Sequence, residues 1–103
     1  MEFKINNTKW IIKLVDEATM NNITKNDYSF GVTIYKTQEI LLLDNQSNII
    51  KTLIHELVHV WLWEYGHGQH DERSWNNEEI CDVVASSINF INEVVNEYKS
   101  KHK

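Results

Sequence analysis

Hydrophobic residues recur at helical spacing in three segments of the chain and alternate with polar residues in one. The first helical pattern lies over residues 8–20, where Thr8 is a candidate cap and apolar residues follow three or four positions apart: Ile11, Leu14, Val15 and Ala18. This spacing predicts an N-terminal helix that ends at Asn21 and Asn22. The preceding segment EFKIN, residues 2–6, is compatible with a short first strand.

Alternation replaces the helical pattern between residues 28 and 44. Phe30, Val32 and Ile34 occupy alternate positions, and β-branched and aromatic residues are frequent there. We expect two strands, near 29–36 and 39–43, that form a small antiparallel hairpin with its turn at 36–38.

Two further helices are predicted in the second half of the chain. One is capped near 45–47 and ends at Gly66, because glycine readily adopts the left-handed conformation that closes helices. Its expected inward residues are Ile50, Leu53, Ile54, Leu57, Val58 and Trp61. After a polar loop over 66–75, a long amphipathic helix is expected to turn inward Ile80, Val83, Val84, Ile88, Ile91, Val94 and Val95. The order of helix, hairpin, helix, loop and helix predicts an α+β fold.

Composition limits the classes of function. The 103 residues predict one domain, residues 1–103, and the formal charge of −5 argues against a nucleic-acid partner. No apolar run approaches the ~20 residues that a membrane span needs. The start of the chain lacks the pattern of a secretory signal, and Cys81 has no second cysteine to pair with. We therefore expect a cytoplasmic protein that does not bind membranes, and the sequence leaves its oligomeric state open.

Residues that can bind a metal and transfer protons are concentrated in the motif His55-Glu56-Leu57-Val58-His59. This is an H-E-x-x-H pattern on the second predicted helix. Residues four apart lie about 40° apart around a helix and one turn along it, so both imidazoles face one point. Glu56 lies on the adjoining face, where it can reach a metal-bound water. This pattern predicts two zinc ligands, His55 and His59, with Glu56 as general base.

The third zinc ligand has several candidates downstream. An extended pattern that requires glycine at 62 and histidine at 65 fails, because Leu62 and Tyr65 stand there. The remaining candidates are His67, His70, Glu78 and Glu79.

The segment Asn77-Glu78-Glu79-Ile80-Cys81-Asp82 resembles the N-E-x-x-S-D signature of thermolysin-like gluzincins, with Cys81 in place of serine. The resemblance implies that Glu78 is the third zinc ligand. It also implies that Asp82 orients a ligand histidine by a hydrogen bond. Glu78 and Asp82 are four apart, so one helix face can present both carboxylates.

The order of elements over ~39–90 also resembles the ImmA/IrrE-type metallopeptidases of phages and mobile elements. This chain lacks the helix-turn-helix region of that group. A further resemblance, to SprT-type zinc proteins, rests on His67-Gly68 alone.

We expect a zinc metallopeptidase that cleaves a peptide or protein substrate, with substrate adding as a strand beside 39–43. Tyr65, His67 or His70 are candidates for stabilising the oxyanion. The alternative is a non-catalytic, zinc-stabilised interaction module of a phage or mobile element. Glu56 favours the enzyme, because structural zinc sites need no general base.

Overall fold

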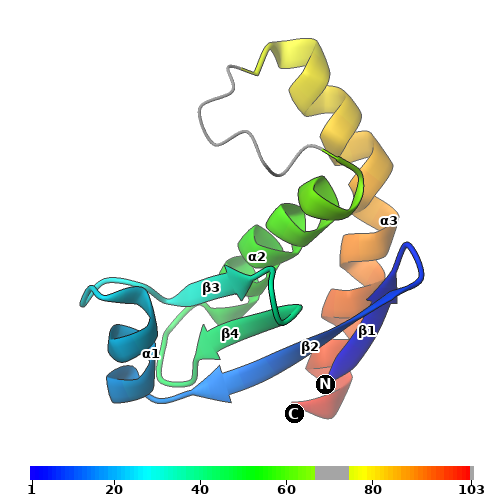
Figure 1. Cartoon of the computed structure of the whole chain (residues 1–103). Helices are drawn as coiled ribbons and strands as arrows, with labels where there is room; N and C mark the ends of the chain where they lie inside the picture. Colours follow the sequence, from blue (N-terminus) through cyan, green and yellow to red (C-terminus); the bar gives the residue numbers. More distant parts are fainter. Residues whose placement is uncertain (67–74, 103) are drawn as a thin grey trace.

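The structure, a computed structural model, describes residues 1–66 and 75–102. Four strands and three helices follow one another along the described chain (Figure 1). Their bounds are β1 Glu2–Ile5, β2 Thr8–Val15, α1 Glu17–Thr24, β3 Gly31–Ile34, β4 Glu39–Leu43, α2 Ile49–Glu64 and α3 Asn77–Lys101. The fold is α+β, as the sequence predicts.

The four strands form one mixed sheet in the order β1-β2-β4-β3. β1 and β2 are antiparallel, β2 and β4 are parallel, and β3 and β4 are antiparallel. The expected antiparallel hairpin is therefore confirmed for β3 and β4, but it is part of a larger mixed sheet. β4 lies inside that sheet and β3 forms one edge.

The predicted helix over 8–20 is wrong for its first half, which forms strand β2. Trp10 and Ile12 point into the core while Lys9 and Lys13 are exposed, so residues 9–13 alternate as a strand does. Helix α1 begins only after Asp16, whose carboxylate accepts a 2.8 Å hydrogen bond from the Thr19 N–H. Pairing with both β1 and β4 outweighs the helical spacing of the apolar residues.

Helix α2 packs against the sheet along a stripe that includes Leu53, Leu57 and Val60, all fully buried. Its N-cap is Asn48, slightly later than the predicted 45–47, and Gly66 follows its end with a φ of 86°. The core joins this stripe to residues of the sheet and of α3: Phe3, Ile5, Trp10, Ile12, Ile40, Leu42, Ile91, Val94, Val95 and Tyr98.

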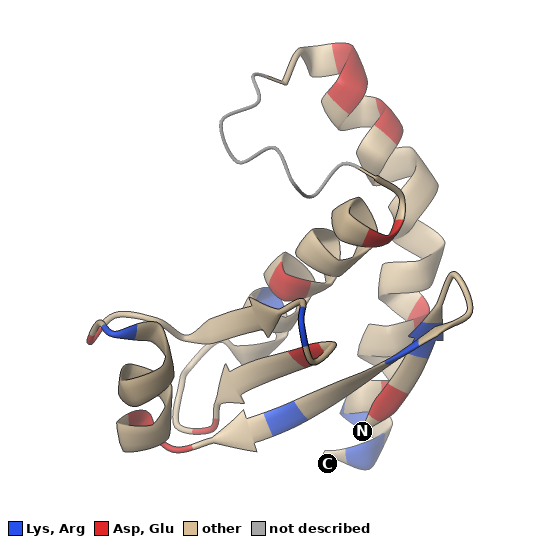
Figure 2. Cartoon of the chain, in the orientation of Figure 1, with Lys and Arg blue, Asp and Glu red and all other residues tan. Residues whose placement is uncertain are grey.

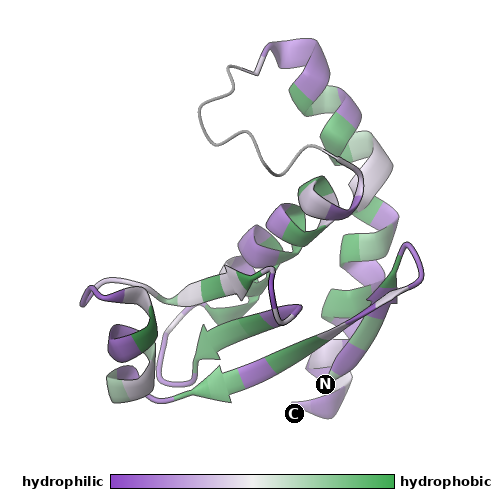
Figure 3. Ribbon diagram, viewed as in Figure 1, coloured by the Kyte–Doolittle hydropathy of each residue, from purple (hydrophilic) through white to green (hydrophobic). Residues whose placement is uncertain are grey.

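Helix α3 begins with a capping box in which Asn76 and Glu79 each bond the other's backbone N–H. Its second half is buried as predicted, whereas Ile80, Val84 and Ile88 are 48%, 52% and 46% exposed. The prediction that these three point into the core is wrong, because the first turns of α3 extend past the sheet (Figures 1 and 3). Within the described ranges, no helix combines the length and apolar character needed to cross a membrane.

Candidate metal and peptide site

Strand β3 and helix α2 approach one another closely at Gly31. A Cβ atom at position 31 would lie 2.6 Å from Thr52 Cγ2 and 3.3 Å from Glu56 Cγ. At the first distance a side chain would force its neighbours to shift, so glycine allows the edge strand to lie against α2 at this level. This approach sets the distance between Glu56 and the strand.

Glu56 is held in the interface between α2 and β3. Its side chain is only 6% exposed, and its Oε1 accepts a 2.9 Å hydrogen bond from the Thr33 hydroxyl. Among the described residues it is the only carboxylate, lysine, arginine or histidine side chain that is buried. Burial of a carboxylate is costly unless donors compensate it, so Thr33 both stabilises Glu56 and fixes its orientation.

His55 and His59 lie next to one another on α2, one turn apart. Their ring centroids are 5.0 Å apart and the rings are inclined at 71°. His55 is exposed and His59 is half-buried, so solvent reaches the pair. Two imidazoles on one accessible stripe, with a buried carboxylate on the adjoining face, are the arrangement that the sequence motif predicts.

Glu78 and Asp82 are not brought to this pair in the structure. Both are exposed on the first turns of α3. Ile80, between them in sequence, lines an apolar hollow of about 210 Å³ together with Val58 and Leu62 of α2. Two residues along a helix correspond to a rotation of about 200°, so Glu78 and Asp82 lie on the side of α3 away from Ile80. Across the described ranges no three histidine, cysteine or carboxylate side chains form a complete metal-binding group.

Two of the other candidates for a ligand or for the oxyanion lie among the described residues, and two do not. Glu79 belongs to the capping box and is half-buried. Tyr65 is exposed, and its ring lies 5.0 Å from that of Trp61. His67 and His70 lie outside the described residues.

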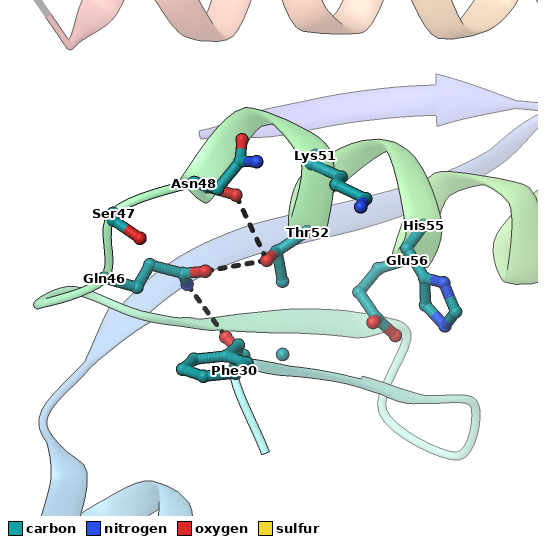
Figure 4. A pocket seen from close by; sticks show the side chains of 9 residues that line it. Phe30, Gln46, Ser47, Asn48, Lys51, Thr52, His55 and Glu56 are labelled. Carbon is teal, nitrogen blue, oxygen red and sulfur yellow. Dashed lines mark hydrogen bonds between the residues drawn. The ribbon is translucent and has the colours of Figure 1, made fainter. Parts of the chain in front are cut away.

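A cavity of about 430 Å³ adjoins the motif (Figure 4). It lies between the start of β3 and the first turns of α2, and its lining residues are Phe30, Gly31, Gln46, Ser47, Asn48, Lys51, Thr52, His55 and Glu56. Hydrogen bonds fix one wall: the Thr52 hydroxyl donates to Gln46 Oε1, and the Gln46 amide donates to the Phe30 and Leu43 carbonyls. Its volume is in the range of small-molecule sites, so it is large enough for a group the size of an amino-acid side chain.

Sequence reasoning missed three residues of this site: Gly31, Thr33 and Lys51. Gly31 had a recognisable signal, because glycine inside a predicted strand often marks close backbone approach. The signal for Thr33 was weaker, because a polar residue is ordinary in a strand of alternating polar and apolar residues. Lys51 had none, since a lysine near a helix start is ordinarily a solvated side chain.

The donor set partly fits zinc. Zinc takes imidazole nitrogens readily, and helical neighbours four apart suit two of its tetrahedral positions. His55 and His59 would hold these two positions, while the described residues provide no third ligand in position.

Comparisons with protein-family models, with curated proteins and with solved structures gave no match for this chain.

Proposed function

We propose that the chain is a zinc-dependent peptidase in which His55 and His59 bind the metal and Glu56 is the general base. The observation that supports this most is the buried, hydrogen-bonded Glu56 beside two accessible imidazoles. A buried carboxylate costs free energy that an apolar side chain would not, whereas a general base needs such a fixed orientation.

Among the described strands, β3 is paired on one side alone, by β4, and this open edge supports an extended peptide as the substrate. The sequence interpretation placed substrate beside 39–43, but β4 is paired on both sides, by β2 and β3. Directly before β3, the Phe30 carbonyl accepts from the Leu43 N–H, so the backbone carbonyl of residue 30 faces β4. Since successive residues of a strand point their backbone groups to opposite sides, Gly31 and Thr33 direct theirs to the open edge. A peptide strand added there passes beside Glu56.

The reaction we propose is hydrolysis of a peptide bond. Zinc, when bound, supplies Lewis-acid polarisation of the carbonyl and acidification of water. Glu56 accepts a proton from the attacking water and transfers it to the leaving nitrogen as the C–N bond breaks. The water oxygen remains in the new carboxylate, and Thr33 keeps the Glu56 carboxyl group in place throughout.

We retain Glu78 as the proposed third ligand and Asp82 as the residue that orients a ligand histidine. The resemblance of residues 77–82 to the gluzincin signature supports both roles. We also propose a reducing, cytoplasmic location, because Cys81 is the only cysteine of the chain.

Glu56 also separates this proposal from its rival, a zinc-stabilised interaction module without activity. Such a module would close all four zinc positions with protein ligands and would have no use for a buried base. The open β3 edge and the adjacent cavity add to the case for a substrate-binding enzyme.

The test compares the zinc-loaded parent with Glu56→Gln on a library of blocked peptides, with mass spectrometry as the readout. We expect cleavage by the parent and none by the variant, while both retain one zinc per chain. Equal activity of the two proteins would contradict the role of Glu56. Loss of zinc from the variant would instead make Glu56 a ligand.

A further inference from the structure

We propose that the cavity beside Glu56 selects a carboxylate group of the substrate and that Lys51 is the counter-charge. This inference rests on the proposed peptidase function, because it assigns a specificity to the same site. It concerns the residue next to the scissile bond, whose side chain enters the cavity when its backbone passes Glu56.

The cavity is placed for that residue. Glu56 and His55 form one end of it, and its remaining walls come from the start of β3 and from residues 46–52 (Figure 4). A peptide paired to the open edge of β3 lies along this opening. One of its side chains then points toward α2, because strand side chains alternate between the two faces.

Lys51 places one positive charge among the residues that line the cavity. The lining also contains the Glu56 carboxylate, but it is buried and accepts a hydrogen bond from Thr33. Lys51 is exposed and has no ion-pair partner within the described residues. One turn away on the same helix stand Asn48 and His55, neither of which is a carboxylate. The positive charge at the rim is therefore available to a ligand.

Neutral groups complete a site suited to a short acidic side chain. Gln46 and Thr52 are already hydrogen-bonded to each other, so they form a fixed wall rather than new partners. Figure 4 shows the Ser47 hydroxyl on the cavity side and the Phe30 ring across from the helix. Phe30, 57% exposed, offers apolar contact for the methylene groups of a glutamate. A basic side chain would be repelled by Lys51, and a large apolar one would cover the polar groups of the walls.

The experiment measures kcat/KM of the zinc-loaded protein on blocked peptides that differ only in glutamate, glutamine or lysine beside the cleaved bond. Lys51→Glu is the test variant, and Lys4→Glu on β1 is the control with the same change in net charge. A glutamate at position 51 lies in the first turn of α2, where the helix dipole favours it, so the variant should fold. Peptides with a free C-terminal carboxylate are compared with amidated ones, to separate a side-chain carboxylate from a terminal one.

We expect the parent and Lys4→Glu to prefer glutamate over glutamine by about threefold to tenfold, as one partly exposed charge-assisted hydrogen bond would give. Lys51→Glu should lose that preference and favour lysine. Equal rates on the glutamate and glutamine peptides, or an unchanged preference in Lys51→Glu, would overturn the proposal while leaving the peptidase intact.

Binding to the zinc-loaded Glu56→Gln variant separates the two proposals. Blocked alanine pentapeptides with a central glutamate or glutamine are the probes, and nuclear magnetic resonance titration is the readout. A preference for glutamate that disappears with Lys51→Glu supports the cavity assignment even if the parent cleaves no peptide. Equal binding of the two peptides contradicts it.

Discussion

The Thr33 hydroxyl donates a 2.9 Å hydrogen bond to the Glu56 carboxylate, and this bond joins edge strand β3 to helix α2. Glu56 comes from the motif helix, while Thr33 is 23 residues away in sequence. The orientation of the proposed base therefore depends on strand pairing as well as on the motif. Gly31, two residues before Thr33 on the same strand, allows the two elements to come this close.

Replacing Thr33 by valine should leave the buried Glu56 carboxylate without its donor. We expect the free energy of unfolding to fall by about 1–3 kcal/mol, the cost of an unsatisfied buried polar group. Urea unfolding measures this. Thr33→Ser retains the hydroxyl and should recover most of the loss; if serine and valine are equally destabilising, packing rather than the hydrogen bond explains the effect.

Replacing Gly31 by alanine should destabilise the contact between β3 and α2. The added methyl group would lie 2.6 Å from Thr52 Cγ2, and overpacking of this kind costs about 1–3 kcal/mol. Thr52→Ser removes that methyl group but keeps the hydroxyl that bonds Gln46 Oε1 at 2.7 Å.

A double-mutant cycle checks the cause. The double variant Gly31→Ala with Thr52→Ser should be more stable than the sum of the two single changes predicts. Strict additivity would mean that Thr52 does not limit the approach at Gly31.

The sequence predicts the helices and strands of this chain best where the local signals fit only one kind of element. The hairpin of β3 and β4, the end of α2 at Gly66 and the start of α3 follow from local signals, and all three are confirmed. Residues 8–15 carry apolar side chains that fit both a helix and a strand. Only the pairing with β1 and β4 decides between them, and that pairing is not local in sequence.

The candidate site, too, is predictable from the sequence only in part. The adjacency of His55, Glu56 and His59 follows from helix geometry alone, because residues four apart lie one turn apart on nearly the same face. The environment of Glu56 depends on which strand borders α2, and a single sequence gives no contact between residues 33 and 56. The exposure of Ile80 and Val84 likewise depends on how far α3 extends past its neighbours, which amphipathic spacing does not report.

Zinc should stabilise the folded chain. A ligand that binds only the folded state adds about 2.7 kcal/mol when its concentration is 100 times its dissociation constant. We expect the melting temperature to rise on zinc addition and to return to the metal-free value on chelation, with calorimetry as the measurement. His55→Ala with His59→Ala is the control, and it should show no response to zinc. A zinc response of the same size in that variant would place the metal elsewhere.

The identity of the third ligand is decided by zinc titration of five alanine variants. From the resemblance of residues 77–82 we expect Glu78→Ala to weaken zinc binding sharply and Asp82→Ala to weaken it about 10–100-fold. Glu79→Ala, His67→Ala and His70→Ala should leave affinity nearly intact. Glu79 also caps α3, so the titration needs a check of the fold by circular dichroism.

In the structure, zinc binding by Glu78 requires a movement that the sequence alone does not indicate. Glu78 is exposed on the side of α3 away from Ile80, so ligation by Glu78 requires the first turns of α3 to turn relative to α2. Zinc should then slow amide hydrogen exchange at residues 77–84 in the parent and not in Glu78→Ala. If His70→Ala proves the damaging change and Glu78→Ala is silent, the gluzincin-like assignment fails and a site of three histidines replaces it.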